Sequence, residues 1–263
     1  MDLGLKNKVA LVAAASRGLG RAVAEELATE GASLVICSRD TRTITQTASE
    51  IAEKSGAHVM AVAADVSVPA DVKRLVQSAI TRFGRVDILV TNGGGPPAGR
   101  FESLTEEQWG AAARLTLFSA IDLAREVLPG MKEKRWGRIL NITSIAVKQP
   151  VDNLMLSNSL RAGLTGFART LANEVAADGI TVNNILPGYT RTERVEELAN
   201  MMAENQGITA AEFKARWESE IPMGRLGEPP EFAALAAFLV SERASYITGT
   251  SIQVDGGWIK SLL

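Results

Sequence analysis

The chain has 263 residues, and 28 Lys and Arg against 30 Asp and Glu give it a formal charge of −2. This balance argues against binding nucleic acid through bulk positive charge. The composition, with 46% hydrophobic and 22% charged residues, is typical of globular domains. One cysteine, Cys37, and one histidine, His58, exclude an internal disulfide and a zinc site of the usual Cys/His kind. Because a signal-peptide pattern and a membrane-length apolar run are both missing from the sequence, we expect a cytoplasmic protein that does not bind membranes.

Short apolar runs predict the strands. Several are apolar at every position, as expected for strands that are buried on both faces of a parallel sheet. In chain order the runs cover residues 9–13, 33–37, 58–62, 86–90, 138–142, 180–185 and 250–254.

Between these runs the apolar residues recur at intervals of three and four, which predicts helices, among them 21–30, 72–83, 156–175 and one that opens at Pro229. The alternation predicts an α/β fold. We expect a single domain over residues 1–263, a doubly wound, Rossmann-like parallel sheet of about seven strands with helices on both faces. The polar stretch 191–220 interrupts the alternation, and we expect it to form a helical flap over a substrate site.

The turn from the first strand into the first helix reads Ala13-Ala-Ala-Ser-Arg-Gly-Leu-Gly20. Glycines at such a turn let the backbone approach a pyrophosphate, which the N–H groups and dipole of the helix N-terminus bind. Two glycines alone are weak evidence, because turns and caps use them too. The predicted contacts with a dinucleotide come from Ser16, Arg17, Gly18, Leu19 and Gly20.

The end of the second strand supports this interpretation, because Ser38-Arg39-Asp40 follows the glycines by about twenty residues. An acidic residue there binds the ribose 2′-OH of NAD(H), whereas an arginine favours the 2′-phosphate of NADP(H). Arg39 and Arg17 together favour NADP(H), and Asp40 keeps NAD(H) open.

In these motifs the sequence resembles the short-chain dehydrogenase/reductase family, and its pattern is similar to that of the 3-oxoacyl-carrier-protein reductases. The family's glycine-rich turn matches Ala14-x-x-x-Gly18-x-Gly20, with alanine in place of the first glycine. Near the C-terminus, Ile247-Thr-Gly and Val254-Asp-Gly-Gly257 also match. The resemblance implies further cofactor contacts: Asp65 and Val66 with adenine, Asn92 and Gly93 after the fourth strand, and Pro187, Gly188 and Thr192 around the nicotinamide.

The catalytic residues match only in part. Family members reduce a carbonyl with a Ser, a Tyr and a Lys, helped by an Asn on a neighbouring helix. Ser144 matches the serine, but Ser157 stands at the tyrosine position, Arg161 at the lysine position and Thr116 at the asparagine position. The resemblance therefore implies a modified catalytic set, in which Arg161 also serves the nicotinamide ribose.

These replacements affect the proton that the reduced carbonyl oxygen must receive. A phenol beside an ammonium group has a lowered pKa, and general acid catalysis contributes roughly 10²–10⁴-fold. A serine hydroxyl is a much weaker acid, and an arginine cannot release a proton in a relay. Tyr189 is a candidate replacement acid and Lys148 a nearby cation, although an ordinary role, a half-buried loop aromatic and a solvated charge, is favoured for each. Ser157 and Arg161 likewise fit an ordinary helix surface.

Three interpretations stay open. The first is an NADP(H)-dependent oxidoreductase that acts on a carbonyl or hydroxyl substrate, 3-oxoacyl reductase-like, by a modified proton route. The second is a cofactor-binding sensor or scaffold without turnover, and the third is a lyase or dehydratase that uses the same pocket. In the flap, the apolar residues Met201, Met202, Phe213 and Trp217 could line an acyl pocket or form a core of their own.

The resemblance also implies a homo-oligomer, a tetramer or a dimer. Family members commonly associate through two long helices, here about 109–133 and 156–177. On the second, Ala162, Gly163 and Gly166 would let another helix approach closely, although they could instead pack within the monomer. Glycine inside a helix costs up to about 1 kcal/mol, which favours a packing reason.

Overall fold

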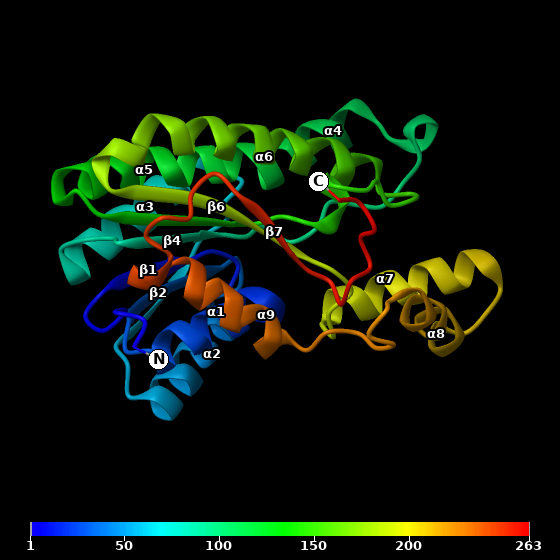
Figure 1. The fold of residues 1–263 in the computed structure, drawn as a ribbon, viewed down its shortest axis with the longest axis horizontal. Coiled ribbons are helices and arrows are strands. Elements are labelled where there is room, and N and C mark those ends of the chain that lie inside the picture. The colour runs from blue at the N-terminus through cyan, green and yellow to red at the C-terminus, as the bar shows by residue number, and fades with distance from the viewer. Residues whose placement is uncertain (1, 263) are drawn as a thin grey trace.

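The seven predicted strands form one parallel sheet in the computed structural model, which describes residues 2–262 (Figure 1). Across the sheet the order is β3-β2-β1-β4-β5-β6-β7, which confirms the predicted doubly wound arrangement. Every pair of neighbouring strands is parallel. The strands are β1 (Val9–Val12), β2 (Ser33–Ser38), β3 (Val59–Ala63), β4 (Ile88–Thr91), β5 (Gly137–Ile142), β6 (Ile180–Pro187) and β7 (Ser251–Val254).

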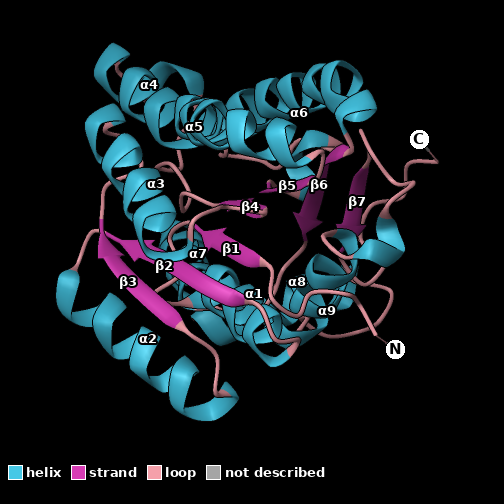
Figure 2. Ribbon diagram, turned by 90° about the vertical axis from the view of Figure 1, so that its left-hand side faces the viewer, coloured by secondary structure: helices cyan, strands magenta, loops and turns pink. Residues whose placement is uncertain are grey.

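Helices cover both faces of this sheet, as predicted (Figure 2). One core lies under α1, α2 and α9, and the other under α3, α5 and α6. Along β1, Ala10 and Val12 join the first core while Leu11 joins the second, so the strand is apolar throughout because both of its faces are buried. The helices are α1 (Gly18–Thr29), α2 (Thr41–Ser55), α3 (Pro69–Phe83), α4 (Glu106–Ala113), α5 (Ser119–Lys134), α6 (Met155–Val175), α7 (Glu193–Gln206), α8 (Ala210–Glu220) and α9 (Pro229–Leu239).

Some boundaries differ from the predictions. The first helix starts at Gly18 rather than at residue 21, directly on the glycine turn. The predicted strand 86–90 starts later, at Ile88, and the buried Asp87 carboxylate instead accepts a hydrogen bond of 2.8 Å from the Val9 N–H. The predicted helix 109–133 is α4 and α5 joined by a π-helical turn, Arg114–Phe118.

The stretch 191–220 forms two helices, α7 and α8, beside the carboxyl end of β6 (Figure 1). Thr192 caps the first helix and Thr209 the second, each accepting a backbone N–H. Phe213 and Trp217 are buried in a small core of the pair, which favours this role over an acyl pocket. Met201 is exposed.

No helix within residues 2–262 is both long and apolar enough to cross a membrane. In that same part of the chain, His, Cys, Asp and Glu side chains do not gather in threes where a metal ion could bind. Cys37 is buried, and burial raises the pKa of its thiol to about 11.

Candidate functional site

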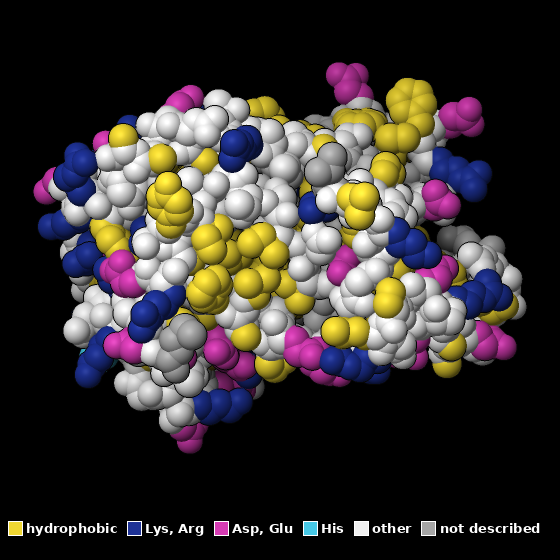
Figure 3. Space-filling model, viewed as in Figure 1, with side chains coloured by type: hydrophobic (Ala, Val, Ile, Leu, Met, Phe, Trp, Pro, Cys, Tyr) yellow, Lys and Arg dark blue, Asp and Glu magenta, His cyan; other side chains and the backbone are white. Residues whose placement is uncertain are grey.

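The loops at the carboxyl ends of the strands enclose a cavity of about 790 Å³. β1 lies between β2 and β4, so the chain reverses its direction across the sheet there and leaves a crevice at the strand ends. In Figure 3 the molecular outline is notched on this side, between the loop before α4 and the α7–α8 pair. Fifteen of the predicted site residues line the cavity: Ser16, Arg17, Gly18, Leu19, Arg39, Asp65, Val66, Asn92, Gly93, Ser144, Ser157, Arg161, Pro187, Gly188 and Thr192.

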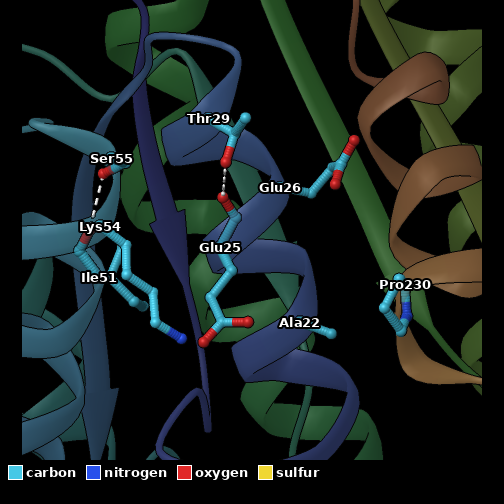
Figure 4. A pocket seen from close by; sticks show the side chains of 8 residues that line it. All are labelled: Ala22, Glu25, Glu26, Thr29, Ile51, Lys54, Ser55 and Pro230. Atoms are coloured by element: carbon cyan, nitrogen blue, oxygen red, sulfur yellow. Dashed lines mark hydrogen bonds between the residues drawn. The ribbon is translucent and has the colours of Figure 1, made fainter.

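A second cavity, of about 230 Å³, lies between α1, α2 and the start of α9 (Figure 4). Its walls include Glu25, Thr29, Lys54 and Pro230, and it contains none of the predicted site residues. The chemistry indicated by the sequence therefore belongs to the larger cavity.

The turn after β1 leaves room for a bound group beside its backbone. Gly18 has a φ of +58°, a conformation that glycine adopts without strain. A methyl group on Gly20 would lie 2.5 Å from the Ala14 carbonyl oxygen, so this position accepts no side chain, and Gly20 itself packs behind the cavity wall. Ala14 has a φ of +48°, a left-handed conformation that costs an L-residue free energy.

The loop after β4 is tied to this turn. The Asn92 side-chain amide donates to the Ala14 carbonyl at 3.2 Å. A methyl group on Gly93 would lie 2.6 Å from the Leu115 carbonyl oxygen of the π-helical turn. The open backbone and the glycines fit the pyrophosphate part of a dinucleotide, which needs N–H groups that no side chain obstructs.

At the end of β2, the Asp40 carboxylate is already engaged. It accepts a hydrogen bond of 2.7 Å from the Thr43 N–H and so caps α2, and this bond lowers the pKa of the Asp40 carboxyl. Arg39 is exposed beside it on the cavity wall. Across the cavity mouth, Arg17 lies 3.8 Å from the Glu197 carboxylate of α7. At the end of β3, Asp65 accepts hydrogen bonds from the N–H and the hydroxyl of Ser67.

Ser144, Ser157 and Arg161 come together at the end of β5. Ser144 Oγ accepts from the Ala146 N–H at 3.1 Å, which fixes the serine at the start of a short helical turn. Ser157 is 8% exposed on the first part of α6, and Arg161 follows one turn later on the same face.

The Arg161 guanidinium binds backbone carbonyls. It donates to Ile142 at 3.0 Å, to Thr143 at 2.7 Å and to Gly94 at 2.9 Å. Burial and, secondly, the positive charge of Arg194 lower the pKa of Arg161 to about 10. Arg161 therefore stays protonated near neutral pH and joins the end of β5 to the loop after β4.

The comparisons with known proteins identify the family. A family model described as enoyl-(acyl carrier protein) reductase matches residues 13–259. The 3-oxoacyl-[acyl-carrier-protein] reductase FabG of Vibrio cholerae is 36% identical over 255 residues, which make up 97% of this chain and 98% of that protein. The chain belongs to the short-chain dehydrogenase/reductase family.

Solved structures of short-chain dehydrogenases/reductases superpose over the whole chain. L-sorbose reductase from Gluconobacter frateurii, complexed with NADPH and L-sorbose, has a TM-score of 0.95 and 36% identity, and the match covers 100% of both chains. A 7α-hydroxysteroid dehydrogenase complexed with NADH and 7-oxo glycochenodeoxycholic acid has a TM-score of 0.90 and 30% identity, covering 100% of this chain and 98% of that one. Neighbours in the family thus include both NADPH and NADH complexes.

Thr116, at the position where the resemblance places the family's asparagine, does not line the cavity. Its hydroxyl is buried in the π-helical turn without a hydrogen-bond partner in the part of the chain that the structure describes. The neighbouring Leu115 carbonyl accepts from the Ser119 hydroxyl at 2.6 Å and faces Gly93. This turn therefore reaches the short-chain dehydrogenase/reductase cavity through Leu115 rather than through Thr116.

Tyr189 lines the cavity but is held within the flap core. Its ring stacks on Trp217, with centroids 4.2 Å apart, and meets Trp258 edge-on at 5.7 Å. Burial and, secondly, the charges of Glu220 and Asp152 raise the pKa of the Tyr189 phenol to about 12. A raised pKa is the opposite of what a general acid needs. Lys148 is not part of the cavity wall.

The sequence reasoning missed Arg194, which lines the cavity from α7. Its guanidinium donates to the Pro96 carbonyl at 3.0 Å and lies 3.8 Å from Glu197. The available signal was its place two residues after Thr192, at the start of the predicted flap. Other missed wall residues are Gly94, Gly95, Pro96, Leu154, Glu193, Val195, Glu197 and Leu198.

Proposed function

We propose that this short-chain dehydrogenase/reductase is an NADP(H)-dependent oxidoreductase that acts on a carbonyl or hydroxyl substrate, 3-oxoacyl reductase-like. The observation that carries the proposal is one continuous cavity, which extends from the glycine turn after β1 to Ser144 after β5. A dinucleotide and a small substrate can therefore share it. The names of the relatives, FabG of Vibrio cholerae and L-sorbose reductase complexed with NADPH, support this reaction class.

The preference for NADP(H) rests on the end of β2. Because the Asp40 carboxylate is bound by the Thr43 N–H, it is less able to accept from a ribose hydroxyl. Arg39 and Arg17 line the same end of the cavity and suit a 2′-phosphate. When bound, the nicotinamide group supplies the reducing equivalent. NAD(H) is the alternative, since a family neighbour is complexed with NADH.

The proton route differs from that of a Tyr–Lys pair. Ser144 and Ser157 place two hydroxyls on the cavity wall, where they can hydrogen-bond a substrate oxygen. Arg161 remains charged and fixed on three carbonyls, so it can stabilise negative charge but cannot deliver a proton. In this proposal the proton comes from solvent through the serine hydroxyls, and Tyr189 is the weaker candidate because of its raised phenol pKa.

A second candidate function is a cofactor-binding protein without turnover, a sensor or scaffold. The contacts of Arg161 favour it, because a guanidinium that holds backbone carbonyls has a structural reason to be there without any catalysis. The flap formed by α7 and α8 fits both candidates, since it borders the cavity in each case.

We also propose a homo-oligomer, a tetramer or a dimer, that uses α6. Ala162, Gly163 and Gly166 are exposed on this helix, and a methyl group on Gly166 would meet nothing within 4 Å. Packing within the monomer therefore does not explain why position 166 is a glycine. In Figure 3 hydrophobic side chains also gather near β7 and α9. Size-exclusion chromatography that shows a clean 28.0 kDa monomer would contradict the proposal.

The first experiment is a calorimetric titration of cofactor-free protein with NADPH and then with NADH. Tight NADPH binding and weak NADH binding are expected, and Arg39→Gln should reduce the difference. A carbonyl panel followed at 340 nm then separates the two candidates: oxidation of NADPH that depends on substrate supports the oxidoreductase. Unchanged turnover in Tyr189→Phe would exclude Tyr189 as the acid, and binding of neither cofactor would refute the proposal.

A further inference from the structure

The side chains of two arginines, one on α6 and one on α7, bind the short loop after β4. Arg161 on α6 donates to the Gly94 carbonyl at 2.9 Å, and Arg194 on α7 donates to the Pro96 carbonyl at 3.0 Å. Between these carbonyls, a methyl group on Gly95 would lie 2.9 Å from two nitrogens of the Arg194 guanidinium. The two guanidiniums therefore border one region of the cavity, whose walls also include Ser144.

The positive charge of this pair is poorly neutralised. Within residues 2–262, no carboxylate lies within 4.0 Å of Arg161, and Arg194 has one ion pair, at 3.8 Å to Glu197. Glu197 lies equally far from Arg17, so its charge is divided between two arginines. Arg161 is half-buried, and a cation in that position without a counter-ion is costly, so an anion that reaches the cavity would relieve the cost. The Arg194 side chain is 46% exposed and adds a second positive charge to the cavity wall.

The remaining walls of this region limit what the anion can be. Ser144 and Ser157 offer hydroxyls, while Leu154, Val195 and Leu198 offer apolar surface. Glu193 also lines the cavity, on the same helix as Arg194. A small acid with a short carbon chain matches this combination of two guanidiniums, two hydroxyls and aliphatic walls.

We propose that Arg161 and Arg194 bind the carboxylate of an acidic substrate, so that this chain acts on a small oxo or hydroxy acid. The inference rests on the proposed oxidoreductase function and narrows its substrate class from carbonyl or hydroxyl compounds in general to small free acids. Arg194 is a specificity residue in this arrangement, because it contacts the substrate carboxylate, and Arg161 both contacts it and supports the loop.

The test uses acetoacetate and its neutral methyl ester as probes. Each is titrated by calorimetry into protein saturated with NADP⁺, so that no reduction takes place. Wild-type protein is expected to bind acetoacetate more tightly than the ester. Arg194→Gln should weaken acetoacetate binding about 10- to 100-fold, the range for hydrogen bonds to charged groups, and change ester binding less than about threefold. Arg194→Lys should recover part of the loss.

Arg216→Gln is the matched control. Arg216 lies on α8 outside the cavity, where it donates to Gln206 at 2.7 Å, so this variant removes the same charge without touching the site. Its probe binding should equal that of wild type. A thermal melt of each variant checks that loss of the Pro96 contact has not unfolded the protein.

Three results would overturn the inference. Equal affinity for acid and ester would remove the case for a carboxylate, and so would a similar loss of both in Arg194→Gln. If that variant instead weakens NADPH and NADH alike and spares acetoacetate, Arg194 serves the cofactor diphosphate. Failure of the proposed function is recognised separately, because neither NADPH nor NADH would bind to wild type in the titration that precedes the probes.

Discussion

Ala14 is the residue at which this chain departs from the glycine-rich pattern, and its φ of +48° gives the departure a measurable cost. A left-handed conformation costs an L-residue about 1–2 kcal/mol, and replacement by glycine removes that cost. Glycine in turn makes the unfolded chain more flexible, which costs about 0.4–1 kcal/mol. The free energy of unfolding of Ala14→Gly should therefore rise by about 0.8 kcal/mol, the difference between the midpoints of the two ranges, equivalent to about 2–3 °C in Tm for a chain of this size.

Ala15→Gly is the matched control, one residue further along the same turn. Ala15 is fully buried and its φ is not positive, so the substitution loses buried surface as well as backbone stiffness. About 0.8 kcal/mol for the buried carbon and about 0.4–1 kcal/mol for the unfolded chain predict a loss of about 1–2 kcal/mol. Urea titration of both variants at pH 7 measures the two effects. If Ala14→Gly destabilises the protein as much as Ala15→Gly, the strain at Ala14 is refuted.

Three further predictions concern single side chains. Arg161→Leu removes the donor to three backbone carbonyls and should lower the free energy of unfolding, measured by urea titration, by about 3 kcal/mol. A loss below about 1 kcal/mol would contradict the role of Arg161 in joining the end of β5 to the loop after β4. The Cys37 thiol has a pKa of about 11, so only about one thiol in a thousand is ionised at pH 8. In folded protein it should react with a thiol reagent at least about 100-fold more slowly than in denatured protein. Equal rates would contradict its burial. The hydrogen bond from Arg225 lowers the pKa of Glu231 from 4.5 to about 2. Glu231→Gln should therefore lower the free energy of unfolding at pH 7, and the loss should shrink as the pH falls from 4.5 towards 2. A loss that does not change with pH would refute the ion pair.

The central strands could be predicted from sequence because they are buried on both faces and are therefore largely apolar, whereas the edge strand β7 is only half-buried and alternates polar with apolar residues. The hydrogen-bond partners of the polar residues inside the sheet could not. Asn141 in β5 accepts from the Thr91 hydroxyl at 2.7 Å and donates to Asn184 in β6 at 3.0 Å, and Asn184 donates to Ser251 at 3.1 Å. Each of these side chains finds its hydrogen-bond partner on a neighbouring strand. Its partner therefore depends on the register between strands, which the local sequence pattern does not reveal.

That the residues proposed for the cofactor lie along one cavity was likewise predictable, because glycine turns and strand ends are local features that the doubly wound fold brings to one edge. Arg194 was missed because its role depends on the loop that ends at Pro96, 98 residues earlier in the chain. The contacts of Arg161 were missed for the same reason: helical spacing placed it on the cavity face, but three carbonyls from two loops determine where its guanidinium lies.

The two halves of the site depend on the fold to different degrees. The cofactor half is made of backbone: Gly20 packs on the Ala14 carbonyl, Gly93 on the Leu115 carbonyl, and Gly188 against Asp255, where a methyl group would lie 2.7 Å away. Any side chain at these positions would displace the neighbouring chain, so the shape of this half is coupled to folding. The other half, around Ser144, depends on two side chains of α6, the buried Ser157 and Arg161. Arg161 joins the end of β5 to the loop after β4 through three backbone carbonyls, so a substitution of Arg161 changes the support of the cavity wall as well as its charge.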